Sequence, residues 1–159
     1  MALSDKIVGM HFRYPDHYVV GREKIREYAE AVKNDHPAYF EDKAAGDLGY
    51  DGILAPLTFI SVFGYQAQAA FFESAKIATT DQKIVQVDQV LKFRRPIKVG
   101  DHLHCEVSVD SVRQSHGTDT IVTKNVISNE DGDEVMETYT TLVGRSEGEG
   151  EEGFTNAIA

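Results

Sequence analysis

The stretch "LTFISVFGYQAQAAFFESAK", Leu57 to Lys76, decides the fold. On a helix its apolar residues cover more than one side, and a helix that is apolar nearly all round has to be covered by other protein. The uncharged run that contains it, Ile53 to Phe72, also holds a proline, a glycine and several polar residues, which argues against a membrane span. We therefore predict a long central helix buried in protein, with one apolar side made by Leu57, Ile60, Phe63, Ala67 and Ala70 and another by Phe59, Val62, Ala69 and Phe72.

The second half of the chain supplies the cover, because the apolar period there changes to two. In Val85 to Phe93 the residues at 85, 87, 91 and 93 are apolar, and in Leu103 to Val109 apolar residues alternate with polar ones. The stretches "TIVTKNVIS" (120–128) and "VMETYTTLV" (135–143) continue this pattern less regularly, and the Asp131-Gly132 pair between them is typical of a hairpin. We predict four half-buried antiparallel strands in a meander.

A first helix precedes these elements in "REKIREYAEAVKN", Arg22 to Asn34. Its apolar stripe is Ile25, Tyr28, Ala29 and Val32, and Pro37 predicts that the helix ends near Asn34. A second, short helix is predicted in "DKAAGDL", residues 42–48. The order of elements predicts an α+β protein with a single hot-dog fold, in which an antiparallel sheet wraps around a long hydrophobic helix.

Composition sets the wider limits. At 159 residues with 42% apolar content, the chain is long enough for one domain, which we place at residues 1–146, followed by an acidic, Gly/Glu-rich flexible tail at residues 147–159. The formal charge of −10 repels phosphate backbones and argues against nucleic-acid binding. The single cysteine and the lack of a secretory pattern at the N-terminus predict a cytoplasmic protein.

The loop "KNDHPAYF", Lys33 to Phe40, points to chemistry. With its flanks it reads "YAEAVKNDHPAYFEDKAAGDLGYDGILAPLT", Tyr28 to Thr58, and resembles the MaoC-like, or hydratase-2, hot-dog family. That family has approximately G-D-x-N-P-x-H in this loop and G-P-x-A-H-G at the turn into the central helix. The resemblance implies reversible loss of water from a (3R)-3-hydroxyacyl thioester, which needs one group to take the alpha proton and another to protonate the departing hydroxyl.

The acid–base pair is missing at the positions that match the motif. Aligned on Pro37, the family's Asp position holds Asn34 and its His position holds Tyr39. An amide does not exchange protons near neutral pH, and a phenol with a pKa of about 10 is a poor base. Asp35 and His36 have the right chemistry, but matching them to the family's Asp and His would shift the alignment so that Pro37 no longer matches the motif's proline. Adjacent residues also generally point in different directions. We therefore expect no catalytic residue in this chain, with Asp35 and His36 as the only substitutes.

Longer segments are similar to the HadA-type or HadC-type subunit of mycobacterial (3R)-hydroxyacyl-ACP dehydratase, including "MALSDKIVGMHFRYPDHY", "VFGYQAQAAFF" and "KIVQVDQVLKF". This resemblance implies a non-catalytic, acyl-chain-binding subunit for type II fatty acid (mycolic acid) elongation. Its partners would be a HadB-type catalytic hot-dog subunit and an acyl carrier protein thioester. Ser61 stands where HadA-type chains carry a reactive cysteine, and Pro56-Leu57 replaces the family's His-Gly. A helix start still offers unpaired N–H groups to a thioester carbonyl.

Further candidates follow from position and charge. The basic run "KFRRPIK" suits docking of an acidic carrier protein through Lys92, Arg94, Arg95 and Lys98, or is simply solvated. His102 and His104 share a sheet face without further ligands, so we predict no metal and no cofactor, and Cys105 lies on the apolar parity of its strand. Seven residues are candidates for contact with the acyl chain, although a core would use the same types: Phe59, Ile60, Phe63, Tyr65, Ala67, Phe71 and Gln86.

Two other functions fit the same residues. The chain can be a self-sufficient homodimeric enoyl-thioester hydratase that uses Asp35 or His36, or an acyl-thioester-binding scaffold without a catalytic partner. Turnover by the isolated chain would favour the first, and indifference to a HadB-type chain would favour the second.

Overall fold

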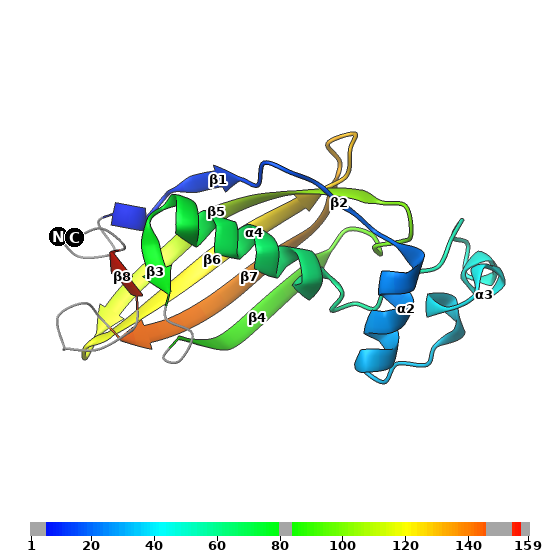
Figure 1. Cartoon of the computed structure of the whole chain (residues 1–159), viewed down its shortest axis with the longest axis horizontal. Coiled ribbons are helices and arrows are strands. Elements are labelled where there is room, and N and C mark those ends of the chain that lie inside the picture. The colour runs from blue at the N-terminus through cyan, green and yellow to red at the C-terminus, as the bar shows by residue number, and fades with distance from the viewer. Residues whose placement is uncertain (1–5, 80–83, 146–153, 157–159) are drawn as a thin grey trace.

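The central helix forms as the sequence predicts. In the computed structural model it is α4, Ile60–Ser74, which starts three residues later than expected. α4 lies along one face of a curved antiparallel sheet, with the smaller helices gathered beyond one end of it (Figure 1). The structure describes residues 6–79, 84–145 and 154–156.

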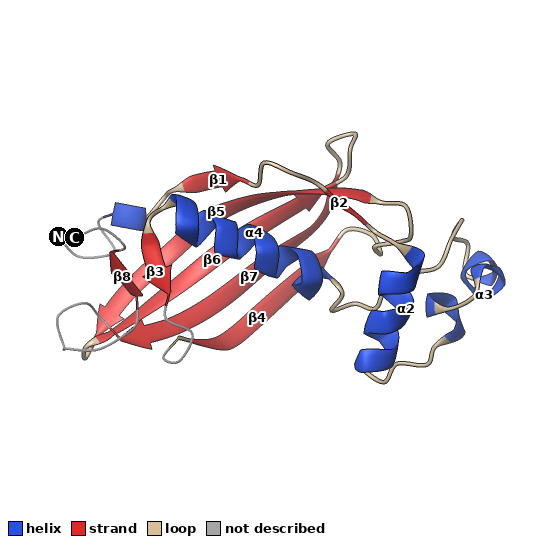
Figure 2. Cartoon of the chain, in the orientation of Figure 1, coloured by secondary structure: helices blue, strands red, loops and turns tan. Residues whose placement is uncertain are grey.

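Four long strands make most of the sheet: β4 (Val85–Phe93), β5 (His102–Ser115), β6 (Thr118–Ser128) and β7 (Glu134–Arg145). Two short strands near the N-terminus, β1 (His11–Arg13) and β2 (Tyr18–Val19), both pair with β5. The order across the sheet is β1-β5-β6-β7-β4, and every pair is antiparallel (Figure 2). This is a hot-dog fold, as predicted.

The prediction of a simple meander is wrong for β4. β5, β6 and β7 do follow one another through hairpins, but β4 pairs with β7 and not with β5. The reason lies in the N-terminal strands, which the apolar pattern did not reveal: they occupy the outer edge of β5 and leave β7 as the free partner for β4. β4 is consequently an edge strand.

The predicted alternation of β4 is wrong at Val85 and Val87, although it holds for Leu91 and Phe93, which pair with buried residues of β7. A register shift between Gln86 and Asp88 breaks the period of two. Gln89 pairs with the buried Thr140, Leu91 pairs with the buried Thr138, and Gln86 lines the same cavity as both threonines. Val85 and Val87, which were expected on the apolar side, are 58% and 57% exposed. In β5, by contrast, the predicted alternation is confirmed from Leu103 to Val109.

One side of α4 packs into the core. Phe59, Phe63 and Phe71 are buried, and their rings contact aromatic residues of the N-terminal segment, namely Phe12, Tyr14 and Tyr18. The described residues leave the opposite side uncovered: Tyr65 is 71% exposed, and Ser61 and Ala69 are exposed too. The expectation that the helix is covered all round is therefore wrong for the single chain.

The first helix is α2, Arg22–Ala31, and it ends earlier than predicted. Ile25 and Ala29 are buried as expected, but Val32 lies beyond the helix and is exposed, followed by Lys33 in the left-handed region (φ 56°). The loop continues as a short 3-10 helix, η1 (Pro37–Tyr39), and the predicted short helix is confirmed as α3, Asp42–Asp47.

A second, two-stranded sheet joins β3 (Ile77–Thr79) to β8 (Phe154–Asn156). β8 belongs to the segment 147–159 that the sequence analysis assigned to a flexible tail, so at least these three residues have regular structure. The prediction for the rest of that tail falls on residues 147–153 and 157–159, which lie outside the described part.

Cys105 provides a test of the core. Its side chain is fully buried on the inner face of β5, and burial raises the pKa of the thiol to about 12 from its ordinary value of 9.0. We expect native protein near pH 8 to react with a disulfide reagent more than about a hundredfold slower than urea-unfolded protein, because only the thiolate reacts and only opening exposes it.

The raised pKa also sets a pH dependence. The unfolded thiol ionises near 9 and the folded thiol near 12, so the stability that Cys105 contributes is complete below pH 9 and is lost as the pH rises towards 12. A Cys105→Ala variant should lack this part of the alkaline destabilisation, measured by urea unfolding across that window. Equal labelling rates for native and unfolded protein would contradict the burial of this thiol.

Candidate functional site

The Pro37 loop is held in place by polar contacts from both sides. Arg26 of α2 donates to the carbonyl of Phe40 at 2.8 Å, and Arg22 donates to both carboxylate oxygens of Asp42 at 2.9 Å. His36 Nδ1 accepts the backbone N–H of Ala38 at 3.2 Å, so this side chain caps η1. The backbone geometry of the loop is thus built by helix-capping contacts.

The loop places Asn34 and Tyr39, the positions that match the family's Asp and His, in different surroundings. Asn34 Oδ1 accepts the backbone N–H of His36 at 3.4 Å, and together with Asp35 it borders a shallow depression beside α2. Tyr39 is partly buried against the core, with its ring 5.6 Å from that of His36. Asp35 and His36 are both exposed, and no hydrogen bond or ion pair between them is present in the described structure.

Backbone N–H groups at the start of α4 are already hydrogen-bonded, unlike those of a helix N-terminus that is free to bind an anion. The backbone N–H groups of Phe59, Ser61 and Val62 donate to the carbonyls of Pro56, Thr58 and Phe59 at 2.9–3.0 Å. The Tyr28 hydroxyl contacts the carbonyl and the hydroxyl of Thr58, both at 2.9 Å, and so connects α2 to this turn. These amides are therefore already bonded within the turn.

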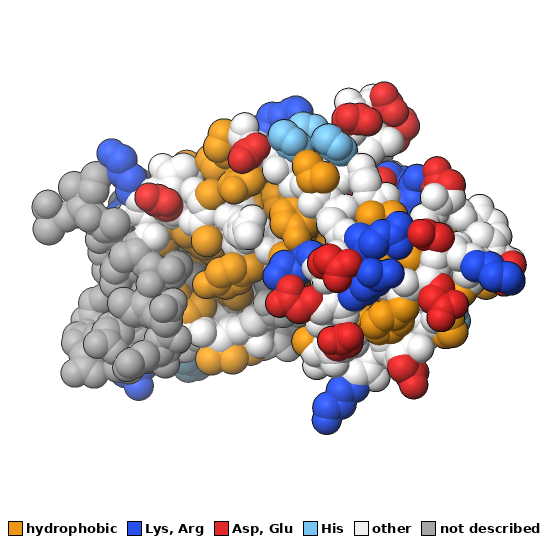
Figure 3. All heavy atoms as spheres, turned by 45° about the vertical axis from the view of Figure 1, so that its right-hand side comes forward, with side chains coloured by type: hydrophobic (Ala, Val, Ile, Leu, Met, Phe, Trp, Pro, Cys, Tyr) orange, Lys and Arg blue, Asp and Glu red, His pale blue; other side chains and the backbone are white. Residues whose placement is uncertain are grey.

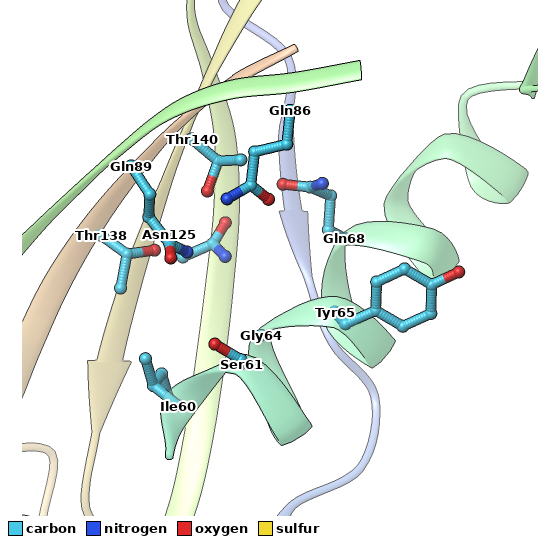
Figure 4. Close-up of a pocket in the computed structure, with 10 residues that line it drawn as sticks. All are labelled: Ile60, Ser61, Gly64, Tyr65, Gln68, Gln86, Gln89, Asn125, Thr138 and Thr140. Carbon is cyan, nitrogen blue, oxygen red and sulfur yellow. The ribbon is translucent and has the colours of Figure 1, made fainter. Parts of the chain in front are cut away.

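A cavity of about 120 Å³ lies between α4 and the sheet (Figure 4). α4 contributes the first turns of its exposed side, β4 contributes two glutamines, and β6 and β7 contribute polar side chains that rise from the sheet. Asn125, Thr138 and Thr140 are each at most 4% exposed, which makes this an unusually polar patch within the core. The lining residues are Ile60, Ser61, Gly64, Tyr65, Gln68, Gln86, Gln89, Asn125, Thr138 and Thr140.

A second cavity of about 220 Å³ adjoins the first and is mainly apolar. Tyr65, Gln68 and Gln86 line both, so the two lie side by side along the exposed side of α4. The remaining lining residues of the second cavity are Ala69, Phe72, Ile84 and Leu142.

The seven residues predicted to contact an acyl chain divide into two groups. Ile60, Tyr65 and Gln86 line the cavities, whereas the other four point into the core: Phe59, Phe63, Ala67 and Phe71. Sequence reasoning missed the polar lining from β6 and β7. The signal was present, because Asn125 has the parity of the buried Ile121 and Ile127, and a polar residue at a core-facing position is informative.

The basic run is largely neutralised within the chain. Arg95 pairs with the buried Asp101 at 2.8 Å, Lys98 with Asp51 at 2.7 Å, and Arg94 with Glu134 at 3.0 Å. Lys92 lies over the ring of Tyr139, 4.8 Å from its centre. Carrier-protein docking through Lys92, Arg94, Arg95 and Lys98 stays a prediction, and it would have to compete with these partners.

His102 and His104 lie near a third histidine, His17. His17 stacks on His102 with ring centres 5.4 Å apart, and its ring lies 5.9 Å from that of His104. Histidine side chains gather at the upper edge of the face in Figure 3, while Lys, Arg, Asp and Glu mix over its right-hand part. Within the described residues no group of three or more His, Cys, Asp and Glu side chains is arranged to hold a metal ion.

The family is established by comparison with known proteins. A family model described as "FAS1-like, dehydratase domain region" matches residues 6–138, which is most of the chain. The chain therefore belongs to this dehydratase family, within the MaoC-like hot-dog proteins. A UPF0336 protein of Mycolicibacterium paratuberculosis is 67% identical over 159 residues, with both chains covered completely.

Solved structures narrow the resemblance. A chain of the HadBC (3R-hydroxyacyl-ACP dehydratase) complex of Mycobacterium tuberculosis is 48% identical with a TM-score of 0.81, over 89% of this chain and all of that one. A protein described as a MaoC-like dehydratase is 39% identical with a TM-score of 0.80, over 88% of this chain but 42% of its own, longer chain. The chain is thus similar to a Had-type dehydratase subunit, and both of these solved structures are described as dehydratases. Among the described residues, no helix is long and apolar enough to cross a bilayer.

Proposed function

We propose that this chain is the non-catalytic, acyl-chain-binding subunit of a heterodimeric (3R)-hydroxyacyl-ACP dehydratase that acts in type II fatty acid elongation, including that of mycolic acids, in the cytoplasm. A HadB-type hot-dog chain supplies the acid and the base, and the substrate is a thioester on acyl carrier protein. The observation that carries the proposal is the pair Asn34 and Tyr39, an amide and a phenol where the family's reaction needs groups that exchange protons.

The loop geometry supports this assignment over a self-sufficient enzyme. His36 accepts the Ala38 amide through Nδ1, a capping role that explains its presence without catalysis. Asp35 is exposed beside α2 and borders neither of the two cavities next to α4. An acid–base pair for elimination has to converge on one bound substrate, and these two side chains border no common cavity.

The uncovered surface supports a partner. β4 is an edge strand with both faces accessible, and three valines on it are 43–58% exposed: Val85, Val87 and Val90. Tyr65 and Ala69 of α4 are exposed next to it along the cavities. An edge with apolar side chains pairs readily with another strand, and a second hot-dog sheet placed there would cover the strand and the helix together.

The test compares three samples: this chain, a HadB-type chain, and their co-expressed mixture, each assayed for hydration of enoyl thioesters and dehydration of hydroxyacyl thioesters. We expect the mixture to form a stable pair and to exceed this chain alone by at least about a hundredfold, the scale of acid–base catalysis. Brisk turnover by the isolated chain would overturn the proposal, as would failure of the two chains to associate.

Replacing the remaining candidates separates the two enzyme models. We expect Asp35→Asn and His36→Gln to change the turnover of the mixture by less than about twofold, because neither group handles a substrate proton. In a self-sufficient enzyme the same changes would cost about a hundredfold or more. Thermal unfolding of each variant serves as the control, since loss of the His36 cap alone is expected to lower the free energy of unfolding by about 0.5–2 kcal/mol.

A further inference from the structure

The polar cavity beside α4 is poorly suited to hydrocarbon alone. A site built only for an alkyl chain would be lined by apolar side chains, as the adjoining cavity is. Here the sheet instead places an amide and two hydroxyl groups, from Asn125, Thr138 and Thr140, at the floor, and all three residues are almost completely buried. The composition of the floor indicates a ligand with a polar group.

The side chain of Asn125 indicates which hydrogen-bonding role the polar group of the ligand has. Its side-chain oxygen Oδ1 is buried and accepts no hydrogen bond from any described residue, and Figure 4 shows the side chain directed into the cavity. A buried carbonyl oxygen without a donor is costly, so such a group is normally satisfied by something bound. The missing partner is a hydrogen-bond donor.

The rest of the lining excludes a charged ligand. Gln86 and Gln89 reach the cavity because the register shift at Val87 turns both toward the inner face, and Ser61 and Gln68 face them from α4. The Gln68 carbonyl is already occupied by the Thr123 hydroxyl at 2.8 Å. No acidic, basic or histidine side chain is among the described residues that line the cavity, so nothing there would compensate a charge.

The adjoining cavity indicates what carries the polar group. Its apolar lining comes from Ala69, Phe72, Ile84 and Leu142, and at about 220 Å³ it holds about seven non-hydrogen atoms, against about four in the polar cavity. Because the two share three lining residues, one ligand reaches both if a hydrocarbon segment carries a small polar group. The pantetheine arm of a thioester also has a hydroxyl group beside two methyl groups, so bare pantetheine is one arm of the test below.

We propose that the polar cavity binds a hydroxyl group carried along the acyl chain, beyond the carbons that react, with its O–H donated to Asn125 Oδ1. A hydroxyl fits because it donates one hydrogen bond and accepts others from the threonine and glutamine side chains. A keto or methoxy group only accepts and leaves Oδ1 unsatisfied. This inference rests on the proposed acyl-binding function and specifies the class of acyl chain that the subunit prefers.

The test measures affinity by calorimetry for dodecanoyl-pantetheine and for two matched series, one with a hydroxyl and one with a keto group at successive carbons beyond the third. The full chain is used, alone and paired with its catalytic partner. We expect one or two hydroxyl isomers to bind about three- to tenfold more tightly than the unsubstituted ligand, the scale of one net hydrogen bond, and no keto isomer to show this gain.

Two variants locate the effect. Asn125→Leu keeps the size of the side chain and removes the acceptor, so the affinities for hydroxylated and unsubstituted ligands should become equal. Gly64→Ala places a methyl group 3.7 Å from Asn125 Nδ2, an ordinary contact in a helix that favours alanine, and should reduce the preference by filling the cavity. Both variants should keep the urea midpoint of the parent or raise it, since each removes an unfavourable feature.

The outcomes separate this inference from the proposed function. Equal affinity for hydroxylated and unsubstituted ligands would overturn the hydroxyl site and leave acyl binding intact. Equal weakening of all ligands by Asn125→Leu, together with binding of bare pantetheine, would assign the cavity to the pantetheine arm and also overturn it. No binding of any acyl ligand, alone or in the pair, would refute the proposed function itself.

Discussion

A chain that carries Val87→Lys and Val90→Lys together is expected to lose association with the HadB-type partner proposed above by more than about a hundredfold. Both valines lie on β4, where they are 57% and 43% exposed, at the edge that a second sheet would extend. Lysine on an edge strand blocks strand addition, and an ammonium group buried without a partner at an interface costs several kcal/mol. About 2.7 kcal/mol already corresponds to a hundredfold change in affinity.

The variant should fold normally, because exposed positions without specific contacts tolerate substitution within about 0.5 kcal/mol. Sedimentation of the mixture measures the association, and the dehydratase activity of the mixture should fall in parallel. Val19→Lys is the matched control: this valine is 50% exposed on β2, at the far side of the sheet from β4. Undiminished pairing of the β4 variant would mean that the partner binds another surface.

The same valines show what apolar periodicity can and cannot predict. The central helix was predictable because its apolar residues lie on more than one side of it. β5 was predictable because its alternation from Leu103 to Val109 has no irregularity. In β4 a single extra residue at the bulge moves Val85 and Val87 away from the inner face, and a pattern count does not register such an insertion. The apolar residues of β4 were recognised correctly, but the direction of Val85 and Val87 was not.

The order in which the strands pair could not be predicted from the sequence, for a different reason. Local patterns indicate strands, whereas the neighbour of a strand depends on which edges remain free after distant segments have packed. The N-terminal strands β1 and β2 have three and two residues, too few to show a period, yet they occupy one edge of β5 and so determine that β4 joins β7.

The candidate site was predictable only in part, because some of its features depend on residue identity and others on how distant strands pair. The prediction that the acid–base pair is missing rests on residue identity at Asn34 and Tyr39, which needs no coordinates. The polar cavity needs them, because Asn125, Thr138 and Gln89 come from three strands and meet only through the register of β6, β7 and β4. Tyr65 and Gln86 were among the seven residues predicted to contact an acyl chain, and both line the cavities; the contact itself stays a prediction.

The largest stability effect is expected from Phe63→Ala in the middle of α4. Phe63 is 1% exposed, and its ring lies 5.6 Å from that of Tyr14 and 5.5 Å from that of Tyr18. Truncation removes these contacts and leaves a cavity between α4 and the N-terminal segment, so the free energy of unfolding should fall by about 3–5 kcal/mol in urea titration. Domains of this size have about 5–15 kcal/mol in total, so the loss is a large part of it.

Phe93→Ala is the matched control, since this ring on β4 is 39% exposed in the isolated chain and its truncation should cost well under half as much. A conservative Phe63→Leu change then separates a core role from a role in binding. It retains most of the packing, at a cost of about 1 kcal/mol, and should leave the affinity for dodecanoyl-pantetheine unchanged, because Phe63 faces the N-terminal aromatic residues and borders neither cavity. A marked loss of acyl affinity in that variant, with the fold intact, would return Phe63 to the acyl-binding surface and would mean that the ligand enters the core side of α4.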